Sequence, residues 1–413
     1  MDKNIAITGA GLTGLVSGYR LGQKGYSVTI FEKEKEAGGL AGGFEINGTN
    51  LEKSYHHIFK SDKYLIDLIE ELGLKDKLKW SESSIGLYFD GKMYPFGTAM
   101  DLLKFNPLGL IDKIRLGLVK IYLEKDKGWE KYKNITAVEW MKKRSGQKAY
   151  EVIWEPLLRG KFHQYYNKIS MAWLWARIHI RGNSKDSDGK ERLGYLIGGF
   201  QQIADELCRK VKENGGKIIL EKEVKEADLV KKYDLVISTI PDEKIDYLGF
   251  VNIIFTSNQN LSRYYWHNIN DINSPFLAFI QQTNLIDKSN YKNENVYYLG
   301  AYVPQNHRFF KISEKKIYEE FFKYLKKIFP EFKEKEIKQK FVFKFKNAQQ
   351  VVTTNYVVPA RQNPSKSPFD KGDLKNKIFH ANFAQIYPED RGMNYAVREA
   401  EKVSGLVMKD LII

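Results

Sequence analysis

The chain has 413 residues, of which 43% are hydrophobic and 14% aromatic, and its formal net charge is +15 at pH 7. This length accommodates two or three hydrophobic cores, and this composition excludes a disordered chain. The positive charge suits an anionic ligand or an anionic membrane face, although a solvated lysine-rich surface is the simpler interpretation. No nucleic-acid-binding motif occurs, so we expect no nucleic-acid partner. The single cysteine, Cys208, excludes internal disulfides and CxxC redox pairs, and its apolar helical surroundings predict a core position.

A glycine-rich turn lies between two predicted strands near the start of the chain. Residues 5–7 form a short apolar run typical of a strand that is buried on both faces, and residues 28–31 predict a second strand. Between them, Gly9, Gly11 and Gly14 have the spacing GxGxxG and open an apolar helical pattern. The order strand, glycine turn, helix, strand is the context that this spacing requires for dinucleotide binding.

Each residue of this turn has a physical role in such a site. Gly9 permits the tight turn, Gly11 lets the backbone approach a diphosphate, and Gly14 lets the helix pack closely on the strand. The N-terminus of the helix offers free N–H groups to the phosphates. Glu32, 18 residues after Gly14, stands where an acid accepts hydrogen bonds from ribose hydroxyls, and its charge would repel the 2′-phosphate of NADP.

A second glycine cluster and a pair of histidines follow. Four glycines within residues 38–43 suit a backbone that lies close to a flat or phosphorylated group. His56 and His57 are adjacent and would point apart on most backbones, and no second cluster with ligand spacing accompanies them. We therefore expect no metal site.

Periodic segments then alternate along the chain. Helices are predicted over 63–72, over 100–122 after Pro107, and over 136–143, 201–212, 314–329 and 393–408. Strands are predicted over 86–94 as a hairpin that turns at Asp90-Gly91, and over 217–220, 235–238, 250–256, 276–282, 296–303, 341–345 and 378–379. Residues 183–190 are expected to cross between domains, and residues 363–373 to form a loop.

The helix that follows Pro107 is amphipathic and basic. Such a face most often packs on its own protein, and a basic amphipathic helix can also lie on a membrane. No run of about 18 apolar residues predicts a spanning helix, and the chain enters a strand directly without a signal peptide. We expect a cytoplasmic protein that is either soluble or peripherally bound to a membrane.

Several motifs together resemble one flavoprotein superfamily, that of protoporphyrinogen oxidase, phytoene desaturase and amine oxidase. They are the glycine turn with Glu32, Gly198-Gly199-Phe200 before a helix, Val224, the segment DLVISTIP at 234–241 and the segment 380–403. The resemblance implies an α/β fold with a Rossmann-like FAD-binding domain and an inserted α+β substrate domain. The implied FAD-binding domain is discontinuous and comprises residues 1–75, 191–245 and 375–413, and the substrate domain comprises residues 76–190 and 246–374.

The resemblance also implies that FAD is the cofactor. The last helix would point its N-terminus at the flavin and stabilise a reduced, anionic ring. The expected cofactor contacts are Gly9, Gly11, Leu12, Thr13, Gly14, Glu32, Lys33, Gly39, Leu40, Gly43, His57, Val224, Thr239, Asn382, Met393, Asn394 and Ala396. The chain departs from the family pattern at Ala381-Asn382, where Gly-Asp is usual, and at Leu40, where an arginine is common.

A second, local likeness involves the segment YHHIFKSD at 55–62, which is similar to a stretch of UDP-galactopyranose mutases. It implies that His57 lies beside the flavin ring, and that Arg391 and Lys161 grip a phosphate. The sequence thus favours an FAD-dependent oxidoreductase that transfers hydride from an amine, porphyrinogen or polyprenoid to flavin N5. A flavin-dependent sugar-nucleotide mutase is the alternative, and a non-catalytic nucleotide-binding regulator is a third possibility.

Overall fold

A parallel five-stranded sheet carries the glycine turn in the computed structural model, which describes residues 3–186, 190–362 and 377–412. In sheet order the strands are β16 (Ile378–His380), β10 (Leu235–Ser238), β1 (Asn4–Thr8), β2 (Ser27–Phe31) and β9 (Lys217–Ile219). The central position of β1 explains its apolar run, because Ile5, Ala6 and Ile7 have no exposed surface. The predicted strands at 5–7 and 28–31 are confirmed.

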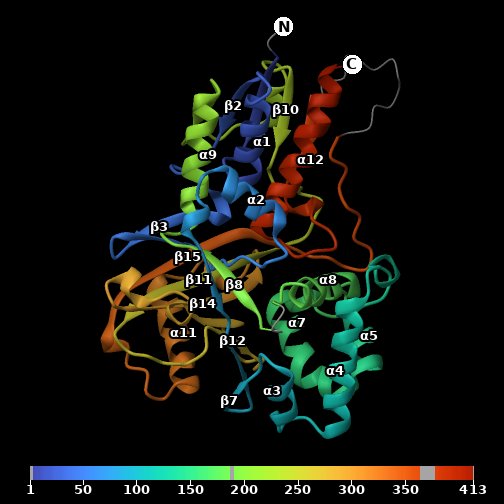
Figure 1. Ribbon diagram of the computed structural model, residues 1–413, viewed down its shortest axis with the longest axis vertical. Coiled ribbons are helices and arrows are strands. Elements are labelled where there is room, and N and C mark those ends of the chain that lie inside the picture. The colour runs from blue at the N-terminus through green and yellow to red at the C-terminus, as the bar shows by residue number, and fades with distance from the viewer. Residues whose placement is uncertain (1–2, 187–189, 363–376, 413) are drawn as a thin grey trace.

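Helices from both ends of the chain cover this sheet. Helix α1 (Leu12–Gly22) packs between α9 (Gln201–Glu213) and α12 (Met393–Ile412), and α2 (Lys63–Glu71) packs on α12 (Figure 1). The chain therefore returns to the same layer from three distant parts of the sequence. The predicted helices at 63–72, 201–212 and 393–408 are confirmed, and the half-buried Cys208 packs against the core beneath α9.

A second sheet of seven strands lies below the first (Figure 1). In sheet order its strands are β15 (Ile337–Gln350), β11 (Tyr247–Ser257), β14 (Asn295–Pro304), β13 (Ala278–Gln281), β12 (Trp266–Ile269), β6 (Ile85–Phe89) and β7 (Lys92–Pro95). Alternate residues of β11 and β14 pack against α11 (Glu314–Ile328), and the others face the upper half of the molecule. Sequence patterning predicted these elements except β12, and the hairpin β6–β7 turns at Asp90-Gly91 as expected.

A helical layer completes the lower half (Figure 1). It contains α3 (Ala99–Lys104), α4 (Leu110–Lys125), α5 (Ala137–Ser145), α6 (Gln147–Ala149), a π-helical turn (Tyr150–Trp154), α7 (Glu155–Phe162) and α8 (Met171–Gly182). Pro107 lies in the break between α3 and α4, so the helical stretch predicted over 100–122 is two helices. Thr136 caps α5, the helix predicted over 136–143, by accepting a hydrogen bond from the backbone N–H of Glu139.

Short elements join these layers. They are β3 (Gly43–Ile46) paired with β4 (Thr49–Glu52), β5 (Leu78–Glu82) paired with β8 (Arg192–Leu196), and α10 (Glu226–Leu229). The loop predicted over 363–373 and part of the crossing predicted over 183–190 lie outside the described residues. The α/β fold class is confirmed, whereas the division into 1–75, 191–245 and 375–413 against 76–190 and 246–374 stays a prediction.

Within the described ranges, no helix combines the length and the apolar character that crossing a membrane requires. In the same part of the chain, no three His, Cys, Asp or Glu side chains are grouped so that they could hold a metal ion.

Candidate functional site

The glycine turn has the geometry that a close-packed backbone site requires. Gly9 has φ +91°, a conformation that L side chains rarely adopt. A Cβ atom on Gly14 would lie 2.0 Å from the carbonyl oxygen of Gly9, so only glycine allows α1 to start this close to β1. Helix α1 has no side-chain cap and no acidic residue in its first turn. Its first amides therefore remain available to an anion.

The second glycine segment lies backbone to backbone against the first. The N–H of Gly38 donates to the carbonyl of Ala10 at 2.8 Å, and a Cβ atom on Gly39 would lie 3.2 Å from the Cα atom of Gly11. Gln201 fixes this segment from α9, because its side chain accepts from the N–H of Gly43 and donates to the carbonyl of Ala37. The backbone of the second glycine segment therefore packs directly against the glycine turn of the same chain.

Glu32 lies at the end of β2 and is 8% exposed. One carboxylate oxygen accepts from the N–H of Ala10 at 2.7 Å, and the other accepts from the N–H of Glu34 at 3.0 Å. The carboxylate is thereby fixed beside the glycine turn. Each of its oxygens has two lone pairs, so both can still accept from the hydroxyls of a ribose.

The N-terminus of α12 meets that of α1. The hydroxyl of Thr13 donates to the carbonyl of Ala396 at 3.4 Å, and the side chain of Asn394 accepts from the N–H of Leu65 at 3.1 Å. Met393 is buried at the first position of α12. The predicted contacts from the two ends of the chain therefore come together, although the side-chain oxygen of Asn394 is used to dock α2.

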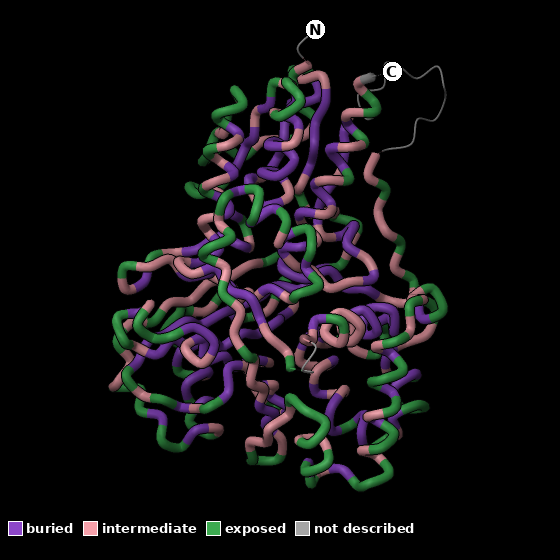
Figure 2. Tube along the Cα trace, viewed as in Figure 1, coloured by how far each residue is buried: buried purple, intermediate pink, exposed green. Residues whose placement is uncertain are grey.

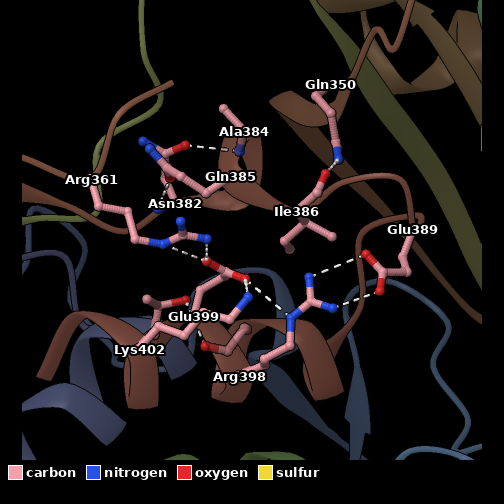
Figure 3. Close-up of polar contacts among 12 residues, drawn as sticks. Gln350, Arg361, Asn382, Ala384, Gln385, Ile386, Glu389, Arg398, Glu399 and Lys402 are labelled. Carbon is pink, nitrogen blue, oxygen red and sulfur yellow. Dashed lines mark hydrogen bonds and ion pairs between the residues drawn. The ribbon is translucent and has the colours of Figure 1, made fainter. Parts of the chain in front are cut away.

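A network of ion pairs holds the start of α12 in place (Figure 3). The carboxylate of Glu399, 1% exposed, receives Arg361, Arg398 and Lys402, and Arg398 also reaches Glu389 at 2.6 Å. This network ties the loop before α12 to the helix itself. It fixes the direction of the positive helix end, which a negative charge on a cofactor would meet.

The other predicted cofactor residues occupy varied environments. Lys33 is exposed beside Glu34, Leu40 and Val224 are half-buried, and the Thr239 hydroxyl donates to the carbonyl of Thr8 beside Gly9. The side chain of Asn382 accepts from the N–H of Ala384 and donates to the carbonyl of Ile240 (Figure 3). Its contact with a cofactor stays a prediction, as do those of the others.

His57 lies where the two halves of the molecule meet. Its ring makes edge contacts with Tyr265 and Trp266, and Nδ1 lies 3.1 Å from the Tyr265 hydroxyl. Burial, with the nearby Arg181, lowers the pKa of His57 to about 4, so the ring is neutral at pH 7. Tyr55 lies beside it against the second sheet, with its ring 5.1 Å from Trp266.

Charged side chains gather close to Tyr55, which packs in one cluster with Tyr302 and interacts with Arg391 and Arg177. The ammonium group of Lys161, 3% exposed, lies 2.5 Å from the carboxylate of Asp390, which Arg177 also reaches at 3.3 Å. Arg391 donates to the Tyr302 hydroxyl at 3.3 Å, whereas its buried Nε has no partner among the described residues. Lys161, Arg177, Asp390, Arg391 and Tyr302 are hereafter called the charged cluster.

The charges within this cluster are strongly coupled. Burial opposes ionisation of Asp390, but Lys161 and Arg177 hold its pKa down to about 2. Burial also opposes ionisation of Tyr302, and Lys161 with Arg391 nevertheless lowers its pKa below the usual value. Three cations thus face a single carboxylate in a buried setting, and an excess of positive charge remains.

A cavity of about 750 Å³ adjoins the charged cluster and lies away from the glycine turn. It is lined by α7, the loop 271–277, β14 and α11. Tyr302 belongs both to this lining and to the charged cluster. The cavity therefore borders the charged cluster at Tyr302.

Comparison with known proteins identifies the family. The family of flavin-containing amine oxidoreductases matches residues 12–271. The chain belongs to this family. Among sequences, mitochondrial protoporphyrinogen oxidase of Nicotiana tabacum is 23% identical over 243 residues, which are 51% of this chain and 48% of that protein.

Two solved structures show the same fold as this chain. Putrescine oxidase bound to putrescine aligns with a TM-score of 0.70 at 14% identity and covers 99% of both chains. Reduced UDP-galactopyranose mutase aligns with a TM-score of 0.68 at 14% identity, covering 98% of this chain and 94% of that one. At such identities the likeness establishes the fold alone. The chain spans about half the length of the curated relatives it matches.

The predicted superfamily and its FAD cofactor are confirmed by the family match. The residues present fit that cofactor, because the cradle at Gly9 and Gly14 has no room for a Cβ atom and leaves the amides of α1 without caps. Glu32 is fixed beside them and retains free lone pairs.

Sequence reasoning missed several residues of this site. Arg177, Asp390 and Tyr302 lie in separate segments, and no local motif announces them. Gln201 was also missed, although its sequence signal was the clearest, because it directly follows the motif Gly198-Gly199-Phe200.

Proposed function

We propose that this chain is an FAD-dependent oxidoreductase that removes hydride from a small-molecule substrate. The observation that carries the proposal is the cradle at Gly9, Gly11 and Gly14 with Glu32 fixed beside it. The amides of α1 would hold the diphosphate, and Glu32 would hold the adenosine ribose. The chemistry that FAD supplies when bound is acceptance of a hydride at N5.

The chain's own groups would then orient the reactants and exclude water. The N-terminus of α12, fixed by the network around Glu399, would stabilise negative charge on the flavin side of the site. Neutral His57 would offer a hydrogen-bonding nitrogen at the aromatic wall formed by Tyr55 and Trp266. Packed aromatic side chains make this wall poor in water, which suits hydride transfer.

The charged cluster would bind an anionic group of the substrate. Its excess positive charge is buried, and Nε of Arg391 lacks a partner, so a carboxylate or phosphate would satisfy both. The ammonium group of Lys161 is already engaged by Asp390, so Arg391 is the stronger candidate for direct contact. The roles predicted for Lys161 and Arg391 remain part of this proposal.

The same excess of positive charge favours a second candidate function, that of a sugar-nucleotide mutase without net oxidation. A nucleoside diphosphate would supply the anion, and the local likeness at 55–62 supports a position for His57 beside the flavin. Both functions involve a small-molecule substrate and suit a cytoplasmic protein.

One experiment separates these functions. The purified protein, checked for bound flavin by its absorbance, is offered amines, porphyrinogens and polyprenoids with oxygen or a quinone as acceptor, and the reduced protein is offered UDP-sugars. Consumption of oxygen or quinone, with bleaching of the flavin band by substrate, supports the oxidoreductase. A rearranged sugar formed without consumption of oxidant would replace it by the mutase. A protein that contains flavin and catalyses neither conversion would contradict both.

A further inference from the structure

Helices α3 and α4 expose an apolar surface that nothing in the chain covers among the residues that the structure describes. Among all the described residues, fifteen large hydrophobic side chains are exposed, and eight of these lie in α3 and α4. They are Met100, Leu103, Leu110, Ile111, Ile114, Leu118, Ile121 and Tyr122, which we call the tip face. The most exposed of these, Leu110 and Ile111, each show 68% of their surface.

Helix α4 has two separate apolar faces. Leu116, Val119 and Leu123 are buried and face the core of the helical layer. At about 100° per residue, the six exposed apolar residues of α4 fall within an arc of about 120° on another side of the helix. The first face is apolar because it is buried in the protein, whereas the second face is apolar and exposed to solvent.

Basic residues border the exposed arc. At the same angular spacing, Arg115 lies about 20° beyond one edge of the arc, and Lys113 and Lys120 lie about 60–80° beyond the other, where Glu124 pairs with Lys120. In α4, all of which the structure describes, no acidic residue falls inside the arc. The neighbouring helix α5 ends in Lys142, Lys143 and Arg144, which are all exposed. An apolar stripe between basic edges is the pattern of a helix that lies in a membrane interface.

The net charge of residues 99–182 also favours an anionic partner. Residues 99–182 contain 17 lysines and arginines against 8 acidic residues, so they carry a net charge of +9 out of the total of +15. Helices α3 and α4 lie at the end of the molecule opposite the chain termini, and exposed stretches mark this end in Figure 2.

We propose that the tip face docks this protein onto an anionic lipid bilayer, with the apolar arc of α4 and the exposed residues of α3 inserted between headgroups. The lysines and arginines at the borders would contact the lipid phosphates. The inference is independent of the proposed function, since it rests on a surface remote from the glycine turn.

Flotation with lipid vesicles tests this proposal. The full chain is mixed with vesicles of phosphatidylcholine alone and with vesicles that contain 30% phosphatidylglycerol. We expect binding to the anionic vesicles that weakens roughly tenfold or more in the variant Ile111→Ser/Leu118→Ser. The matched control Ile272→Ser/Val357→Ser removes two equally exposed apolar side chains elsewhere and should bind like the parent chain. Flavin content and thermal melting confirm that each variant is folded.

Charge provides a second arm of the test. Arg115→Gln/Lys120→Gln should bind anionic vesicles less tightly, and high salt should weaken the parent chain in the same way. Failure of the parent chain to float, or equal flotation of the Ile111→Ser/Leu118→Ser variant, would overturn the proposal. So would a dimer in solution that this variant converts to a monomer, because the tip face would then bind a second copy.

Discussion

The two halves of the molecule differ in whether backbone or side-chain groups would contact a ligand. Around the glycine turn, recognition depends on the backbone, because Gly9, Gly14 and the first amides of α1 leave a cradle without side chains. In the charged cluster, which we propose as the substrate site, recognition would depend on side chains from α7, α8, β14 and the loop before α12. A cofactor shared by a family suits the first design, and a substrate that differs among relatives suits the second.

This difference also decides how each half responds to mutation. A backbone cradle fails when a single Cβ atom is added, whereas a cluster of buried charges loses stability when one charge loses its partner.

Gly14→Val should abolish retention of FAD. The added Cβ atom would lie 2.0 Å from the carbonyl oxygen of Gly9, so α1 must move away from β1 and take its amides with it. We expect the affinity for FAD to fall at least about a hundredfold, measured by flavin absorbance and titration of the apoprotein. Gly405→Ala is the control, because its Cβ atom would meet nothing within 4 Å. Normal flavin content in Gly14→Val would refute the backbone cradle.

Lys161→Met should destabilise the lower half of the molecule. It removes the ammonium group that pairs with Asp390 and leaves Arg177 as the remaining ion-pair partner, and breaking a buried pair on one side typically costs about 3 kcal/mol. Urea denaturation measures the loss, and the double variant Lys161→Met/Asp390→Asn should not recover it, because Arg177 and Arg391 would then lack the carboxylate that they face. The exposed pair of Lys63 and Asp67 provides the control, since Lys63→Met should change little. A double variant as stable as the parent chain would contradict this role of Asp390.

Acid should weaken the protein through His267. Its ring is fully buried between the carbonyl of Phe279 and the hydroxyl of Ser262, and burial lowers its pKa to about 3. The folded state therefore keeps it neutral while the unfolded chain, with a pKa near 6.5, takes up a proton. The stabilisation is complete above about pH 6.5 and is lost as the pH falls toward 3, with about 2 kcal/mol gone at pH 5.

The variant His267→Gln tests this linkage. The difference in unfolding free energy between parent and variant should shrink by about 2 kcal/mol from pH 8 to pH 5. An unchanged difference would show that His267 does not supply the pH dependence. The predicted result would assign this pH dependence to the second sheet and not to the glycine turn, because His267 lies in β12.

Glu32→Gln should have the smallest effect. The amide keeps an oxygen that can accept from the N–H of Ala10, but its NH2 group replaces the oxygen that accepts from Glu34, and the charge that would strengthen hydrogen bonds from ribose is lost. We expect about tenfold weaker binding of FAD, roughly 1.4 kcal/mol, measured by fluorescence titration. Undiminished affinity would remove Glu32 from the ribose site.

Most of the upper half could be predicted from the sequence because its determinants are local. Gly9, Gly11 and Gly14 act through their spacing, and Glu32 follows at the end of the next strand, so one short segment contains most of the information. The hairpin at Asp90-Gly91 and the cap at Thr136 were predictable for the same reason.

The charged cluster could not be predicted as a unit. Arg177 looks like one more residue of an aromatic helix, and Asp390 follows an ordinary loop, until the fold brings them within 3.3 Å of each other. Strand β12 was missed because only four residues pair there and two of them, His267 and Asn268, are polar. Properties that arise from tertiary contacts leave no periodic signal in the sequence.

A crystal structure of the protein grown with FAD would show directly whether the glycine turn and Glu32 bind the cofactor. We expect oxygens of the diphosphate to lie within hydrogen-bonding distance of the backbone amides at the start of α1, and the adenosine ribose to contact Glu32. A diphosphate bound elsewhere, or a ribose that does not touch Glu32, would contradict this expectation.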